Sequence, residues 1–332
     1  MKEGLENEAI AAVAVQEQAD FFEKNGAFFT SYAGDSSLEI KQSPKGLGTF
    51  AIDLEKGVMY AEPKFWDQTG GFESSDKVFA TLHEFEHFKE MMEMISKEGG
   101  LVKFKKHLDK FKKRKRFSIL DNCVDDIKMN RSVIGRASAL DEARSNLYEK
   151  KLFAEDNLSK APKHLQFSQA FLREAMLPGR QTIVSLDVRA EIERIKNIKS
   201  GGVSLMNFMT APNTPMETRL KLQERFLEPI MEKFFKKDVE RKETETGEGG
   251  EGSEGGGSEK GEEGVEGSEE EEKDYKKKKK SKKDKKNEKL GKDKPKNPED
   301  YFKDEYDKWD KKNPQILPMK EIEKALEEYE KV

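Results

Sequence analysis

The chain contains little of what disulfide-stabilised or membrane proteins require. Its 332 residues include one cysteine, Cys123, which excludes an intramolecular disulfide and favours a reducing compartment. It has no run of about 18 apolar residues, so we expect no membrane span. The first residues, from Met1 onwards, lack the uninterrupted apolar core of a signal peptide. These absences predict a soluble, cytoplasmic protein with no membrane partner.

Histidine is also scarce, yet two of the four histidines stand in one short motif. Residues 81–87 read Thr-Leu-His-Glu-Phe-Glu-His and contain His-Glu-x-x-His. Positions i and i+4 lie on the same face of an α-helix, so His83 and His87 can direct two imidazole nitrogens at one point. A tetrahedral zinc ion needs this geometry from two of its ligands, with Glu84 beside the water that it binds. The motif therefore predicts Zn²⁺ as the cofactor.

Charge is distributed unevenly along the chain. Charged residues make up 39% of it and apolar residues 34%, which is too polar for one uniform globule, while the net charge of −4 says little about partners. We predict a folded domain over residues 1–239. A disordered linker, rich first in Glu and Gly and then in Lys, is expected over residues 240–300. Residues 301–332 are expected to form a short aromatic and helical element that docks on a protein partner.

Hydrophobic periodicity predicts an α+β fold that is mostly α-helical, with a small β-hairpin or sheet. The hairpin is expected over residues 49–61, where Phe50, Ile52 and Leu54 alternate with smaller or polar residues before a Glu-Lys-Gly turn. Gly26 is expected to end the first helix. Helices are expected over residues 6–25, 76–97, 101–116, 118–135, 139–155, 164–177, 186–198 and 215–236.

A catalytic zinc site takes a third ligand from the protein, and the fourth predicted helix offers acidic candidates. At about 100° per residue, Asp126 falls within an apolar arc, where a carboxylate is costly unless it is paired or binds a metal. Asp125 falls on the opposite, wetter side and is the alternative ligand, with Asp121 a weaker one. Asn122 and Asn130 lie one turn either side of Asp126 and are expected to hydrogen-bond the ligands.

The expected chemistry is hydrolysis of a peptide bond. Two imidazoles and a carboxylate leave the fourth zinc position to water, whose pKa falls towards about 7. Glu84 would accept a proton from this water and pass it to the leaving amine. The hairpin edge could receive an extended peptide or protein substrate as an added strand. The stabiliser of the oxyanion stays open among Arg131, Arg136, Tyr148 and His164.

The HEFEH stretch resembles the signature of the zincin metallopeptidases, which it matches at every fixed position. A hairpin, then the motif helix, then a helix with an acidic ligand is similar to the gluzincin order in its small minigluzincin form, over residues 45–135. The resemblance implies a zincin-like core in which His83 and His87 bind zinc and Glu84 is the catalytic base. The extended third-histidine motif of metzincins is missing, which disfavours that branch.

The third ligand departs from the gluzincin pattern, because gluzincins use Glu where this chain offers only Asp. Asp126 followed by Asn130 also resembles the Asp-x-x-x-Asn helix of another group of HExxH proteins, some of them associated with von Willebrand-type domains. This match is short. The identity of the third ligand therefore stays open between Asp126 and Asp125.

Two other functions compete with that of a peptidase. A zincin-like module that binds metal without cutting would serve as a scaffold in a larger complex. A nucleic-acid-associated protein would use the Lys-rich segments, one of which spans residues 103–116. This is the weaker alternative. We also expect the Glu-rich stretch over residues 244–272 to mask the basic segment, since their charges are opposite.

Overall fold

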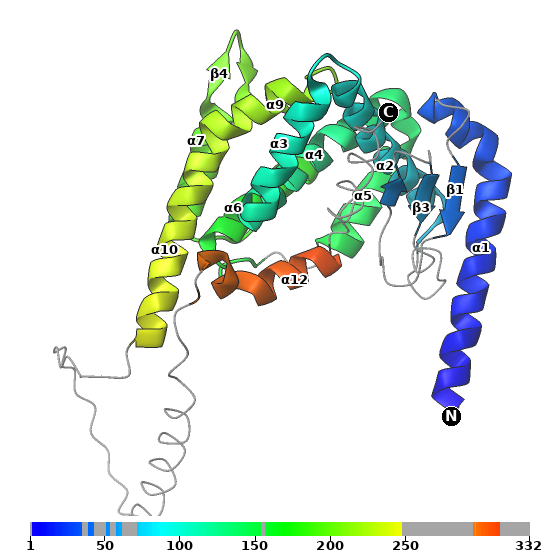
Figure 1. The fold of residues 1–332 in the computed structure, drawn as a ribbon, viewed down its shortest axis with the longest axis horizontal. Helices are drawn as coiled ribbons and strands as arrows, with labels where there is room; N and C mark the ends of the chain where they lie inside the picture. Colours follow the sequence, from blue (N-terminus) through cyan, green and yellow to red (C-terminus); the bar gives the residue numbers. More distant parts are fainter. Residues whose placement is uncertain are drawn as a thin grey trace, which may run out of the picture. The chain divides into compact units, whose positions relative to one another are not determined.

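The computed structural model describes residues 2–34, 39–42, 51–53, 58–61, 72–153, 157–247, 295 and 297–312. Helices account for 78% of these residues, and two very small sheets accompany them (Figure 1). The expectation of a mostly helical chain with a small sheet is thus confirmed. Most of the predicted linker lies outside the described residues, as does the chain after residue 312.

The chain divides into two compact units, Met1–Phe235 with Lys303–Val332 and Lys236–Phe302. The candidate site belongs to the first unit. Its N-terminal helix α1, Lys2–Ala33, is longer than predicted and passes through Gly26. The expectation that Gly26 ends the helix is wrong, because packing outweighs the weak helix propensity of glycine. Beyond that glycine, Phe29 is fully buried and its ring lies 5.8 Å from that of Phe85.

The predicted hairpin is present as β2, Ala51–Asp53, and β3, Val58–Ala61. The two strands are antiparallel, with Ile52 opposite Met59. A third strand, β1 (Glu39–Gln42), pairs in parallel with β3, so the order is β1-β3-β2. Sequence patterning missed β1 because its four residues include one apolar side chain.

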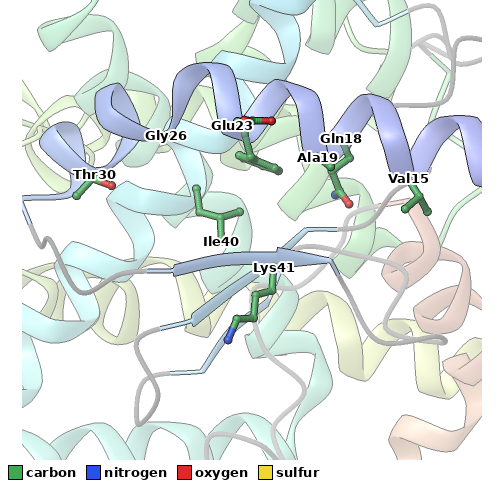
Figure 2. Close-up of a pocket in the computed structure, with 9 residues that line it drawn as sticks. Val15, Gln18, Ala19, Glu23, Gly26, Thr30, Ile40 and Lys41 are labelled. Atoms are coloured by element: carbon green, nitrogen blue, oxygen red, sulfur yellow. The ribbon is translucent and has the colours of Figure 1, made fainter.

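Helix α1 runs beside this sheet (Figure 1). The side-chain amide of Gln18 donates a 2.7 Å hydrogen bond to the carbonyl of Ala61, which ties α1 to β3. A groove of about 410 Å³ is lined by Val15 and Phe22 of α1 and by Ile40 of β1, among others. Figure 2 shows Val15 on the helix and Ile40 on the strand at this groove. Strand β3 is the central strand of this sheet, because it pairs with β2 on one side and with β1 on the other.

Two long helices carry the candidate site: α2, Ser74–Ile95, and α4, Lys115–Arg136. Helix α2 begins after Glu73, whose backbone N–H donates to the Asp76 carboxylate at 3.0 Å. Helix α4 packs on α2 and on α6. It is buried on two sides because apolar residues recur along it at helical spacing. The fully buried ones include Leu120, Val124 and Ile127.

The remaining helices build the frame around α2 and α4. The predicted helix over residues 139–155 divides into three short pieces, and the one over residues 215–236 contains a π-helical segment, η5. The elements are α3 (Gly100–Lys113), η3 (Ser138–Leu140), α5 (Asp141–Asn146), η4 (Leu147–Leu152), α6 (Lys163–Met176), α7 (Leu186–Asn197), β4 (Lys199–Ser200), β5 (Val203–Ser204), α8 (Leu205–Met209), α9 (Met216–Leu222), η5 (Gln223–Leu227), α10 (Glu228–Gly247), η6 (Pro298–Phe302) and α12 (Lys303–Lys312).

The basic segment around α3 meets acidic side chains of the folded helices. Lys103 contacts Glu217 at 3.3 Å, Lys110 contacts Glu228, and Arg116 contacts Glu232 at 2.7 Å. These ion pairs cross from α3 and the start of α4 to α9 and α10. Three cations of the basic segment are therefore paired within the chain.

Helix α12, which is part of the aromatic element predicted over residues 301–332, belongs to the first unit. Tyr306 and Trp309 are buried, and the Tyr306 hydroxyl lies 3.1 Å from His164 Nε2 on α6. The two rings thus pack on the chain's own residues. Among the helices that the structure describes, none combines the length and the apolar character needed to cross a bilayer.

Candidate metal centre

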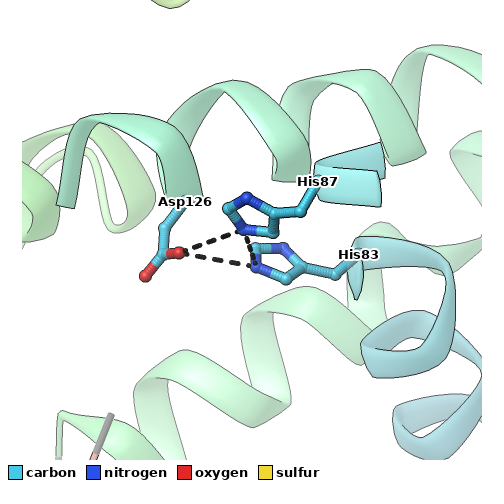
Figure 3. Close-up of side chains that lie close together, drawn as sticks. All are labelled: His83, His87 and Asp126. Atoms are coloured by element: carbon cyan, nitrogen blue, oxygen red, sulfur yellow. Dashed lines mark hydrogen bonds and ion pairs between the residues drawn. The ribbon is translucent and has the colours of Figure 1, made fainter. Parts of the chain in front are cut away.

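Helices α2 and α4 bring His83, His87 and Asp126 together; we call these three residues the candidate metal centre (Figure 3). The Nε2 atoms of the two histidines are 3.1 Å apart, and each lies 3.5 Å from Asp126 Oδ1. One ligand atom from each residue falls within 4.8 Å of the others. The three side chains are only 7% to 14% exposed. The histidines meet because they stand one turn apart on α2, and α4 crosses that face at Asp126.

The two asparagines predicted to support the ligands contact them. Asn122 donates a 3.0 Å hydrogen bond from Nδ2 to Asp126 Oδ1. The Asn130 carbonyl Oδ1 lies 2.9 Å from His83 Nδ1, and its Nδ2 donates to the Tyr148 hydroxyl at 2.7 Å. Since Oδ1 can only accept, Nδ1 of His83 carries a proton, and Nε2 is the nitrogen that faces Asp126. Contacts of this kind fix the tautomer and the ring orientation of metal-binding histidines.

The two histidines of the centre differ in their pKa values, although both lie beside the Asp126 carboxylate. Burial lowers the pKa of His87 to about 4. Burial also opposes charge on His83, but its hydrogen bond and charge interaction with Asp126 outweigh this and raise its pKa. Burial acts against the charged form of Asp126 too, yet the two histidines hold its pKa below the usual value. Two Nε2 atoms at 3.1 Å can share one proton at most, and a divalent cation would replace it.

Glu84 lies beside this centre with a half-buried side chain whose Oε2 atom is buried. Its Oε2 atom has no hydrogen-bond partner among the residues that the structure describes. Burial, followed by repulsion from Asp126, raises the pKa of Glu84 to about 7, although His83 acts in the opposite direction. A buried carboxylate oxygen without a donor is costly unless a ligand or water satisfies it. This carboxylate is therefore suited to exchange a proton near neutral pH.

The alternative ligand Asp125 points elsewhere. It lies 2.7 Å from Arg219 Nη2, and the same guanidinium also contacts Glu90, which in turn contacts Lys128. We call Glu90, Asp125, Lys128 and Arg219 the ionic cluster. Sequence reasoning missed this cluster, because Arg219 is far away in the chain and no pattern links it to the others.

Asp121, the weakest candidate ligand, also lies outside the centre. Its carboxylate contacts His107 at 3.3 Å and accepts a 2.9 Å hydrogen bond from Gln223. Attraction to the His107 side chain and these bonds outweigh its burial and lower its pKa. The geometry thus groups only one of the three aspartates, Asp126, with the histidines.

The four candidates for an oxyanion stabiliser separate in the same way. Tyr148 bonds Asn130 and is thus one side chain away from His83. The other three are engaged at other places. Arg136 contacts Glu86 at 3.0 Å, His164 contacts Tyr306 at 3.1 Å, and Arg131 contacts Thr210 and Asn207.

The donor set suits zinc. Two neutral imidazoles and one carboxylate are the protein ligands of catalytic zinc sites that keep an open position. The side chains are largely buried and are held in orientation by asparagine contacts. Comparison with protein-family models, with curated proteins and with solved structures gave no match, so the functional argument stands on this geometry.

Proposed function

We propose that the protein is a zinc-dependent metallopeptidase. One observation carries the proposal: a His83–His87–Asp126 grouping with the carboxylate of Glu84 beside it, whose buried Oε2 atom has no partner among the described residues. His83, His87 and Asp126 would hold the metal through two Nε2 atoms and one carboxylate oxygen. Zinc bound there would polarise a peptide carbonyl and lower the pKa of water.

The chain's own residues would handle the proton. Glu84 accepts it at the carboxylate from the attacking water and returns it to the nitrogen of the leaving amine. Its pKa of about 7 supports both steps, since the group can take up and release a proton near neutrality. Asn130 and Asn122 keep His83 and Asp126 in orientation while charge develops.

The test combines metal analysis with cleavage of a broad peptide library. Wild-type protein should contain about one zinc per chain and cleave peptides. Glu84→Gln should keep the zinc and lose cleavage by about a hundred- to ten-thousand-fold, the usual contribution of a general base. Glu93→Gln changes an exposed glutamate on the same helix and should leave cleavage unchanged.

Two outcomes would overturn parts of this proposal. Retained cleavage in Glu84→Gln would remove Glu84 from its role as base. Stoichiometric zinc in wild-type protein without any cleavage would favour the non-catalytic scaffold.

A further inference from the structure

A cavity of about 480 Å³ lies between α4, α5, the end of α6 and the segment after α8. Its volume falls in the range of about 300–1,000 Å³ that is usual for ligand pockets. Its wall includes Asn130, Arg131, Ile134, Arg144, Met176 and Pro212. No step of the proposed hydrolysis uses this cavity.

Arg131 is a half-buried cation in this cavity without a counter-ion among the described residues. Its guanidinium contacts the Thr210 hydroxyl and, at 3.1 Å, the Asn207 side-chain carbonyl, both of which are neutral. Burial lowers its pKa, and no carboxylate offsets this effect. A desolvated guanidinium presents a planar fork of donors that matches a carboxylate. Arg131 is thus suited to bind an anion.

The second arginine of the cavity is in a different state. Arg144 contacts Asp141 at 2.7 Å and donates a 2.6 Å hydrogen bond to the carbonyl of Met176. Asp141 also lines the cavity. Two arginines and one aspartate give the wall a formal charge of +2 − 1 = +1. The uncompensated charge is that of Arg131.

The cavity touches the candidate metal centre through one side chain. Asn130 lines the cavity and also contacts His83 Nδ1 at 2.9 Å. Asn130 Nδ2 lies 3.2 Å from Met176 Sδ, on the apolar part of the cavity wall. The Asn130 side chain and the His83 ring therefore separate a group in the cavity from the position that a metal would occupy.

The rest of the wall is apolar. Ile134, Ala175, Met176 and Pro212 provide it, opposite a single uncompensated guanidinium. A ligand that satisfies both parts carries a carboxylate next to an apolar side chain. The C-terminal residue of a peptide has this combination, whereas an acidic side chain in mid-chain brings polar backbone to the apolar wall.

We propose that this cavity binds the free C-terminus of the peptide substrate, with Arg131 on the α-carboxylate and the apolar wall on the last side chain. This rests on the proposed peptidase function and deepens it, because it names the substrate class. Peptides would be cut near a free C-terminus that ends in an apolar residue.

Direct binding tests the inference without any cleavage. Full-length, zinc-loaded Glu84→Gln protein is titrated by calorimetry with N-acetyl-Ala-Ala-Leu as the free acid. The same peptide as a C-terminal amide removes the α-carboxylate. N-acetyl-Ala-Ala-Glu amide carries its carboxylate on a side chain only. The free acid should bind at least about tenfold more tightly than either amide, given the strength of hydrogen bonds between charged groups.

Variants of the cavity assign this difference to Arg131. Arg131→Gln should weaken binding of the free acid by about ten- to a hundred-fold and leave the leucine amide unchanged. Arg131→Lys keeps the charge without the fork and should fall in between. Arg194→Gln removes an arginine on the surface of α7 as a control and should change neither affinity. Ala175→Phe fills the cavity and should weaken the free acid and the leucine amide alike.

Melting curves show whether the Arg131 variants fold; if they do not, the acid and amide pair with Ala175→Phe still decides. Equal affinity of acid and amide, preference for the glutamate peptide, or no binding of any peptide would each overturn the inference. The peptidase proposal fails separately, through missing zinc or missing library cleavage. Cleavage of internal bonds at equal rates in acids and amides would keep the peptidase and reject the C-terminal pocket.

Discussion

Helices α2 and α4 contribute to two buried polar groups, in which different side chains accompany the carboxylates. In the ionic cluster, acidic Glu90 and Asp125 meet Lys128 and the fully buried Arg219. In the candidate metal centre, Asp126 meets two imidazoles instead. The groups are neighbours in sequence, since Asp125 precedes Asp126.

This difference separates a structural role from a functional one. A buried carboxylate is tolerated when a cation accompanies it. The ionic cluster carries its own cations, so it needs nothing from solution. In the candidate metal centre, burial lowers the pKa of His87 to about 4 and disfavours its charge, whereas the interactions of His83 with Asp126 outweigh burial and raise the pKa of His83. Of the two groups, the candidate metal centre is the one whose ligand atoms could hold a metal ion.

The largest expected effect comes from breaking the ionic cluster. Arg219→Met leaves Glu90 and Asp125 buried without their shared partner, so we expect a loss of about 3–5 kcal/mol in the free energy of unfolding. Urea denaturation monitored by circular dichroism measures it. Arg225→Met, on the exposed side of η5, is the matched control and should stay within about 0.5 kcal/mol of wild type. Equal effects of the two substitutions would contradict the role given to Arg219.

The second effect comes from removing metal. Zinc at a free concentration a hundredfold above its Kd should stabilise wild-type protein against unfolding by about 2.7 kcal/mol and so raise its melting temperature. A chelator should abolish this rise. Asp126→Ala should lose the response to zinc. Asp125→Ala should lower stability but keep the response, because Asp125 contacts Arg219. The reverse pattern would make Asp125 the ligand.

The smallest effect tests the residues that orient the ligands. Asn130→Ala frees His83 Nδ1 and should lower zinc affinity by about ten- to a hundred-fold, measured by competition with a chromophoric chelator. Gln223→Ala removes an equivalent hydrogen bond from Asp121, outside the centre, and should leave zinc affinity unchanged. If both variants bound zinc like wild type, the asparagine contact would be incidental.

The sequence predicted the parts of the site that local periodicity controls. His83 and His87 meet because they are four residues apart on one helix, and Asp126 was chosen because it falls in an apolar arc. Burial of a charged side chain on a helix does not by itself indicate a metal ligand. Lys128 and Glu90 are also buried, and they form an ion pair with each other. A buried charge in a helical pattern thus indicates a partner without saying which.

The fold was predicted to a similar depth. The hairpin and most helices follow from apolar spacing, but α1 passes through Gly26 and β1 was missed, because both depend on tertiary contacts that a local pattern does not contain. The basic segment was expected to meet the Glu-rich stretch. Three of its cations meet Glu217, Glu228 and Glu232 on folded helices, and residues 248–272 of the Glu-rich stretch lie outside the described residues, so the masking stays a prediction.

Asn130 has a consequence for the order of binding events. Its carbonyl contacts His83 of the candidate metal centre, while its amide group contacts the Tyr148 hydroxyl and Met176, the second of which lines the cavity. A ligand that shifts this side chain changes metal affinity by the same factor by which the metal changes affinity for the ligand. If the cavity and the candidate metal centre are both occupied, the Asn130 side chain is the contact through which each would influence the other.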